Sequence, residues 1–169
     1  KNKWDTDCRW WSTPYTSDIC WFTGFSHVNL SGVGCPDLGT IITMPTSGEL
    51  TTDYKLYGSD YTGETAQPGY YALKLSKYDI MAEVASTMRS SIERYTYRKG
   101  KAHVIVNLGQ GLTNESGGFI RKVSDTEIEG MRLCGGFCYH SQAVFPQYFV
   151  IRVNQIPKEA GFWKKQPNM

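Results

Sequence analysis

Apolar residues alternate with polar ones in several short segments of the chain, and each such segment predicts a β-strand. In the segment from Ile80 to Val84, for example, Ile80, Ala82 and Val84 fall on one face of an extended chain. The predicted strands are 40–44, 71–75, 80–84, 93–97, 103–108 and 148–153. Strands that recur every ~8–12 residues, with turn residues between them, are the pattern of an antiparallel β-sandwich. The fold class predicted from the sequence is therefore all-β, with little helix.

Some of these segments carry a finer signal. We expect Pro45 to close the strand at 40–44, and the basic, glycine-containing run 98–101 to form a turn between two strands. The apolar and β-branched run at 103–108 is typical of a central strand. A helix over 80–92 is the alternative to a strand there, but its β-branched residues and serines disfavour it.

Length and composition narrow the function classes. The chain has 169 residues and a formal charge of +2, so one domain over 1–169 is expected, and the near-neutral charge argues against a nucleic-acid partner. No apolar run approaches the ~18 residues of a membrane-spanning helix. The cysteines match no zinc pattern, and we favour buried or half-buried thiols over a bridge or a metal half-site for the last two. They are Cys8, Cys20, Cys35, Cys134 and Cys138.

Aromatic residues gather near the start of the chain, in a segment expected to be irregular. Trp10, Trp11 and Tyr15 lie beside small hydroxyl residues. Indole rings can pack on the apolar face of a pyranose while hydroxyl and amide groups orient its OH groups, so these residues are candidates for sugar binding. The alternative is that both indoles belong to the core. Neighbours in an extended chain point opposite ways, which leaves the two interpretations open.

A glycine-rich segment over 24–39 is the second candidate, and we expect it to form an ordered loop. Its glycines do not follow the spacing of a phosphate-binding turn. His27 and Asp37 are its only ionisable side chains apart from Cys35, and together they could bind hydroxyls or act as acid and base. A lone histidine, however, is more often a structural residue.

Catalytic carboxylates are not evident. Glu115, in the polar loop 114–118, is better explained as part of a turn, and nothing in the sequence brings it close to Asp37. Glycoside hydrolysis requires two carboxylates at the scissile bond. No Ser-His-Asp order or nucleophile elbow is present either.

The glycine-rich segment also carries a family resemblance. The first motifs lie in and just after this segment: Gly24-Phe25-Ser26-His27, Leu30-Ser31-Gly32, Gly34-Cys35-Pro36-Asp37-Leu38-Gly39 and Met44-Pro45. Further motifs follow along the chain: Pro68-Gly69-Tyr70-Tyr71, Arg94-Tyr95-Thr96, Asn107-Leu108-Gly109, 124–130, Phe137-Cys138-Tyr139 and Tyr148-Phe149-Val150. This series resembles glycoside hydrolase family 92, the bacterial exo-acting α-mannosidases, in order and over nearly the whole chain. The resemblance implies most of an N-terminal β-sandwich of the galactose-mutarotase-like type, followed in the parent enzyme by an (α/α)6 barrel.

What the resemblance implies for function lies partly outside the chain. The parent enzyme would be a calcium-dependent, inverting α-mannosidase, expected to cleave α-1,2 linkages of mannose-containing glycans. Its catalytic residues and Ca²⁺ ligands would lie in the barrel, so this chain would hold no catalytic residue and no metal and would be inactive alone. Trp10, Trp11, Tyr15, His27 and Asp37 would face the sugar pocket. The parent enzyme would be periplasmic, secreted or at the cell surface of a bacterium.

Two other functions remain open on the sequence. A free-standing carbohydrate-binding module would use the tryptophans as a platform and would bind mannosides unaided. A purely structural or oligomerisation domain would tolerate loss of Trp11 and His27 without loss of activity. If the barrel is the partner, we also expect an exposed apolar patch where it docks.

Overall fold

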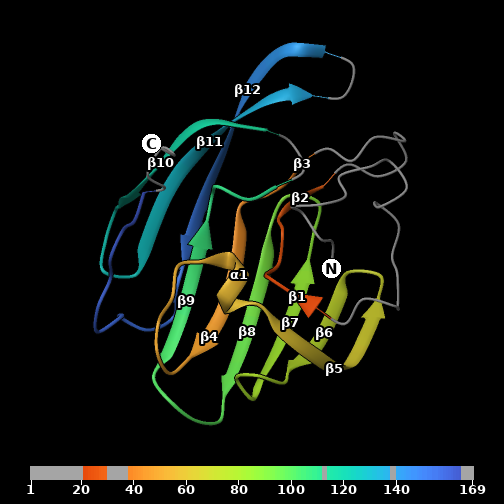
Figure 1. Ribbon diagram of the computed structural model, residues 1–169, viewed down its shortest axis with the longest axis vertical. Helices are drawn as coiled ribbons and strands as arrows, with labels where there is room; N and C mark the ends of the chain where they lie inside the picture. Colours follow the sequence, from red (N-terminus) through yellow and green to blue (C-terminus); the bar gives the residue numbers. More distant parts are fainter. Residues whose placement is uncertain (1–20, 30–37, 112–113, 138–139, 165–169) are drawn as a thin grey trace.

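The regular secondary structure of the described residues is almost all β-strand (Figure 1). The structure is a computed structural model that describes residues 21–29, 38–111, 114–137 and 140–164. The described elements are β1 (Trp21–Phe22), β2 (Val28–Asn29), β3 (Leu38–Thr40), β4 (Ile42–Ser47), α1 (Tyr54–Tyr57), β5 (Ser59–Gln67), β6 (Tyr70–Leu75), β7 (Ile80–Ser86), β8 (Ser91–Tyr97), β9 (Ala102–Asn107), β10 (Asn114–Lys122), β11 (Glu127–Phe137) and β12 (His140–Arg152). The all-β prediction is confirmed, and the one described helix has four residues.

The largest sheet has five antiparallel strands in the order β1-β5-β6-β7-β8. Strands β5 to β8 follow one another along the chain and connect by short turns, whereas β1 adds to the edge of β5 from the start of the described chain. Pro68 and Gly69 make the turn from β5 to β6, where Gly69 has a φ of +77°. Proline favours the first central position of such a turn, and a positive φ at the second favours glycine. The strands predicted at 71–75, 80–84 and 93–97 are β6, β7 and β8.

A pair of strands, β4 and β9, packs on this sheet and completes the core. Met44 of β4 and Ile105 of β9 are buried in one cluster with residues of the large sheet. That cluster also contains Phe22, Phe25, Tyr57, Tyr61, Leu73, Leu75, Tyr78, Ile80 and Ala82. The period-two pattern of β7 thus places Ile80 and Ala82 in the core, as the sequence predicts. Two layers with apolar side chains between them are the sandwich arrangement.

Pro45 does not end a strand, in contrast to the sequence prediction. It lies inside β4, opposite Val104 of β9. Thr43, two residues earlier, directs its N–H and C=O away from β9, because both are bonded to Phe25 at 2.9 and 2.8 Å. Backbone groups two residues apart point the same way in a strand, so the nitrogen of Pro45 also faces away from β9. The missing N–H therefore costs no bond to β9.

The third sheet, β10-β11-β12, has the longest strands and lies at the upper left of Figure 1. The predicted strand at 148–153 is the second half of β12, which ends at Arg152. One face of this sheet carries Phe119, Tyr148 and Val150, which are 46%, 74% and 56% exposed. These side chains are the described candidates for the apolar docking patch that the sequence analysis expects.

Candidate functional site

The described part of the glycine-rich segment runs beside β4, and this places His27. Phe25 and Thr43 exchange two backbone hydrogen bonds of 2.8 and 2.9 Å, and the N–H of His27 donates to the Thr40 carbonyl at 3.0 Å. The close approach requires a glycine at position 24. A Cβ there would lie 2.3 Å from Cγ2 of Ile42, and its φ is +141°. The segment is therefore held beside β4 by an isolated antiparallel bridge between Phe25 and Thr43, two residues before His27.

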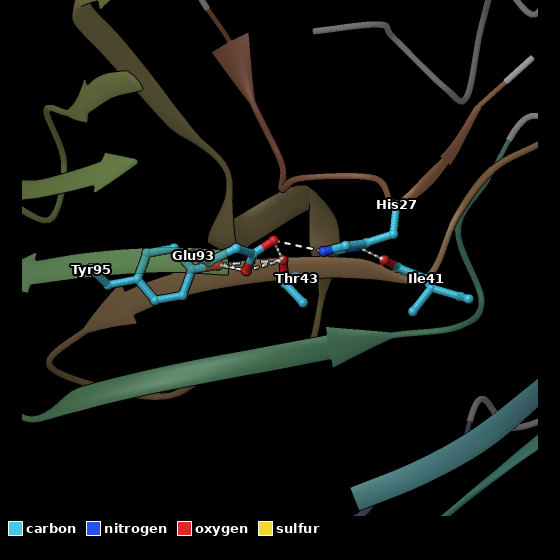
Figure 2. Close-up of polar contacts among 5 residues, drawn as sticks. All are labelled: His27, Ile41, Thr43, Glu93 and Tyr95. Atoms are coloured by element: carbon cyan, nitrogen blue, oxygen red, sulfur yellow. Dashed lines mark hydrogen bonds and ion pairs between the residues drawn. The ribbon is translucent and has the colours of Figure 1, made fainter. Parts of the chain in front are cut away.

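Both ring nitrogens of His27 have partners inside the domain (Figure 2). Nδ1 lies 2.5 Å from the Ile41 carbonyl oxygen, and Nε2 lies 2.6 Å from Oε1 of Glu93. A carbonyl and an ionised carboxylate can only accept hydrogen bonds, so each nitrogen carries a proton. His27 is thus an imidazolium paired with the Glu93 carboxylate. The His27 and Glu93 side chains are 24% and 13% exposed.

Glu93 is satisfied by side chains from three segments. Besides His27, the hydroxyl of Thr43 on β4 lies 2.9 Å from Oε2 and 3.0 Å from Oε1. The hydroxyl of Tyr95, two residues along β8, donates to Oε2. A carboxylate that accepts several hydrogen bonds from neutral and charged donors is held in its ionised form. We call His27, Thr43, Glu93 and Tyr95 the His27–Glu93 cluster.

Electrostatics favour the charged forms of both partners. Burial alone would lower the pKa of His27, but the hydrogen bond and charge of Glu93 outweigh it, and the pKa is raised above 6.5. Burial alone would raise the pKa of Glu93, but hydrogen bonds led by that of His27 outweigh it, and the pKa falls below 4.5. Burial and then the neighbouring carboxylate raise the pKa of Tyr95. Its hydroxyl therefore stays protonated and donates.

In this geometry the His27–Glu93 cluster holds the glycine-rich segment in place against β4 and β8. Every charged group in it is already neutralised by a neighbour, and a sugar hydroxyl would have to displace Ile41 or Glu93 to reach a nitrogen of His27. The cluster joins the glycine-rich segment to β4 and β8. Its position fixes the start of the segment that leads to Asp37.

The structure brings together a different pair from the one the sequence suggested. His27 meets Glu93, which is 66 residues away, whereas Asp37 lies outside the described residues. The candidates Trp10, Trp11 and Tyr15 lie outside them as well. Cys134 is a buried free thiol, whereas Cys138 is outside the described residues.

Glu93 was missed by the sequence analysis, although a signal for it exists. Glu93, Tyr95 and Tyr97 alternate with exposed residues along β8, so Glu93 occupies an inward position. A carboxylate at a core-facing position of a strand needs a cation or several donors. The sequence gives no distance to His27, so the partner could not be named.

A second buried polar group lies at the end of β9. Tyr57 donates to Oε1 of Gln110 at 3.0 Å, and Nδ2 of Asn107 donates to the Tyr57 hydroxyl at 2.9 Å. Burial, the first cause, raises the pKa of Tyr57 to about 12. The guanidinium of Arg132 on β11, only 1% exposed, donates to the Gln110 carbonyl. This group joins β9 to the third sheet.

The described residues offer no site for a metal ion. Among them, no three or more His, Cys, Asp or Glu side chains are grouped in a way that could bind one. Calcium takes six to eight oxygen ligands, and no carboxylate cluster of the kind that supplies them is found among these residues. Of the helices described, none has the length and apolar character needed to cross a membrane.

Fold and site together define the class of molecule: an all-β domain of antiparallel sheets whose glycine-rich segment is held by a half-buried ion pair. The model of the glycosyl hydrolase family 92 N-terminal domain matches residues 2–169. The chain belongs to glycoside hydrolase family 92, and it is the N-terminal domain of that family.

Solved structures agree with the family. Two structures of a family GH92 α-mannosidase from Bacteroides thetaiotaomicron are similar to this chain. The one in complex with mannoimidazole is 30% identical, with a TM-score of 0.71, and the other is 29% identical, with a TM-score of 0.73. Each match covers 86% of this chain but only 20% and 21% of the respective solved chain, so this chain spans about a fifth of their length. No curated protein matches the sequence.

Proposed function

We propose that this chain is the N-terminal domain of an exo-acting α-mannosidase that removes terminal mannose from glycans. The observation that carries the proposal is the likeness to a family GH92 α-mannosidase, in sequence and in fold, over 86% of the chain. The domain would line one side of the sugar pocket, and the larger remaining part of the enzyme would form the other. No catalytic role is assigned to a residue of this chain.

The His27–Glu93 cluster supports a positioning role for the domain. Four side chains from three segments hold the start of the glycine-rich segment, and the segment leads to Asp37. We propose that Asp37, with Trp10, Trp11 and Tyr15, contacts the sugar. His27 would orient this surface through its fixed ring, and a direct contact from His27 would require release of one of its two present partners.

The finer features of the reaction are also proposals. They are inversion of the anomeric configuration, dependence on Ca²⁺ and a preference for α-1,2 linkages. Since the described residues form no group that suits calcium, its ligands and the two carboxylates of the reaction would lie in the remainder of the parent enzyme. We propose a periplasmic, secreted or cell-surface location on the basis of the family alone.

The test is mannose release from a panel of α-linked mannobioses. It is run with this chain and with the same chain extended to the end of its reading frame, each with and without a calcium chelator. We expect release only by the extended chain, fastest from the α-1,2 disaccharide, and loss of that activity with the chelator. Release by this chain alone would contradict the proposal. If neither chain releases mannose but this chain binds mannosides in calorimetry, a carbohydrate-binding module is the better explanation.

A further inference from the structure

Among the described strands, β9 has one hydrogen-bonded neighbour, β4, and its other edge has no partner. Its register with β4 shows which backbone groups face outward. Thr43 directs its N–H and C=O away from β9, and Val106 lies directly opposite Thr43. Residues opposite each other in an antiparallel pair are either both bonded or both unbonded to one another. The N–H and C=O of Val106 therefore point away from β4.

The alternation in the direction of the backbone groups continues along β9. Backbone groups two residues apart point the same way, so Ala102 and Val104 also face outward. Gly48, which donates to the carbonyl of Lys101 at 2.9 Å, confirms that the intervening positions face β4. No described residue bonds to the outward groups of Ala102, Val104 or Val106. The edge thus offers three N–H and C=O pairs at alternate residues of β9.

This edge lacks the features that protect other edges of the molecule. Strand β10 has a bulge between Glu115 and Gly117, β12 contains Pro146, and Glu93 and Arg94 place charges on β8. Bulges, prolines and charges are the usual means by which exposed edges avoid pairing. Along Ala102–Asn107 the strand has no proline and no bulge, and its only titratable side chain is His103. Val104 is 45% exposed.

The composition of β9 suits an interior strand. The sequence pattern predicts a central strand at 103–108, yet the described structure pairs it on one side only. A flat, β-branched strand with one unpaired edge is a template for another strand. The disagreement between composition and position indicates that a neighbour belongs at this edge.

We propose that the outward edge of β9 pairs with a β-strand from the polypeptide that follows this domain in the full-length enzyme. Two observations select this occupant. Each match aligns 86% of this chain with only 20% or 21% of the solved chain, so the relatives contain ample further polypeptide to supply a strand. The segment after β12 already passes the start of β9, since Lys101 and Glu159 form an ion pair of 2.8 Å. This proposal rests on family membership and not on the proposed activity.

Hydrogen exchange of single backbone amides tests the edge. In this chain alone, the outward amides of Val104 and Val106 should exchange roughly 100-fold faster than that of Ile105, which faces β4. In the chain extended to the end of its reading frame, Val104 and Val106 should gain roughly 100-fold protection while Ile105 changes little. If the amides of Val104 and Val106 exchange equally fast in this chain and in the extended chain, the proposal is wrong. This holds whether or not the extended chain hydrolyses mannobiose.

Two other outcomes would also overturn it. Protection of Val104 and Val106 in a monomer of this chain would mean that the chain covers its own edge. Protection that rises with protein concentration would mean that a second copy is the occupant. A matched pair of variants excludes indirect effects: Val104→Pro removes an outward N–H without removing a bond to β4, whereas Val104→Thr keeps it. In the extended chain, only Val104→Pro should lower the protection of Val106, by at least about tenfold.

Discussion

At the scale of single residues, Glu93 illustrates how a charge is kept inside a β-domain. Its carboxylate is 13% exposed, and its hydrogen bonds come from an imidazolium and two hydroxyls. Such an arrangement offsets the desolvation of the charge only while every donor is present, because hydrogen bonds to charged groups contribute about 1.5–3 kcal/mol each and unmet ones cost as much. The ion pair is therefore sensitive to the loss of either partner.

Glu93→Gln tests this sensitivity. The amide keeps the shape of the side chain but removes the negative charge that His27 faces. Its NH₂ group cannot accept the hydrogen bonds that His27 and Tyr95 donate to the carboxylate. We expect a loss of about 1–3 kcal/mol in the free energy of unfolding, measured with urea. Glu159→Gln is the matched control, because the Lys101–Glu159 pair is 58% and 77% exposed and should contribute at most about 1 kcal/mol. Equal effects of the two substitutions would show that Glu93 is not held as described.

The ion pair also makes stability depend on pH, with opposite signs for its two members. The folded pKa of His27 is above 6.5, so its contribution is complete below pH 6.5 and is lost as the pH rises through the folded pKa. The folded pKa of Glu93 is below 4.5, so its contribution is complete above pH 4.5 and is lost as the pH falls through the folded pKa. The difference in unfolding free energy between the wild type and His27→Gln should therefore be largest between pH 4.5 and 6.5. If the difference in unfolding free energy between the two proteins keeps growing towards pH 9, His27 is not protonated in the folded state.

At the scale of the secondary-structure elements, the glycine-rich segment depends on one close approach. Gly24 passes so near β4 that an added Cβ would lie 2.7 Å from the Thr43 carbonyl oxygen and 2.3 Å from Ile42. Neither neighbour can move freely, since Thr43 bonds to Phe25 and Ile42 is 1% exposed. The backbone bonds of Phe25 and the position of His27 follow from this approach.

Gly24→Ala should separate the segment from β4. We expect a loss of more than about 3 kcal/mol in unfolding free energy, together with faster amide exchange at Phe25 and His27. Gly63→Ala is the control, because Gly63 also has a positive φ, +62°, but has open space around it. That variant should lose only the ~1–2 kcal/mol of the left-handed conformation. Similar losses in both variants would mean that strain alone, and not the contact with β4, makes position 24 a glycine.

The elements that could be predicted from the sequence are those with a simple period. Alternation identified β6, β7, β8 and the second half of β12, because each has one face in contact with apolar neighbours. It missed β10 and β11; on β11, the buried positions 130 and 132 hold Gly130 and Arg132, which break the apolar pattern. Pro45 was misread because the chain pattern does not reveal which way its nitrogen faces. The glycine-rich segment and His27 were identified as candidates, but Glu93 was not. Its contact with His27 joins residues 66 positions apart, and such a contact produces no local sequence pattern.

At the scale of the whole molecule, exposed apolar side chains collect outside the sandwich core. They include Phe119, Tyr148 and Val150 on the third sheet and Phe162 and Trp163 after it, all at least 43% exposed. Arg121 and Glu129 form an ion pair on the same face as Phe119. A face with apolar centres and paired charges suits contact with another folded body. Under the proposed function, we expect the remainder of the parent enzyme to contact this face.

The proposed role in sugar binding is best tested in the chain extended to the end of its reading frame. Trp11→Ala should lower kcat/KM for α-mannobiose by about tenfold, the loss of roughly 1.4 kcal/mol expected from one stacked aromatic ring. Met88→Ala is the control, because Met88 is 93% exposed in the turn between β7 and β8 and has no proposed part in binding. A domain with only a structural role would leave kcat/KM unchanged in Trp11→Ala. A fall in kcat/KM matched by an equal loss of folded protein would likewise contradict a contact with the sugar, so both variants are compared at equal folded concentration.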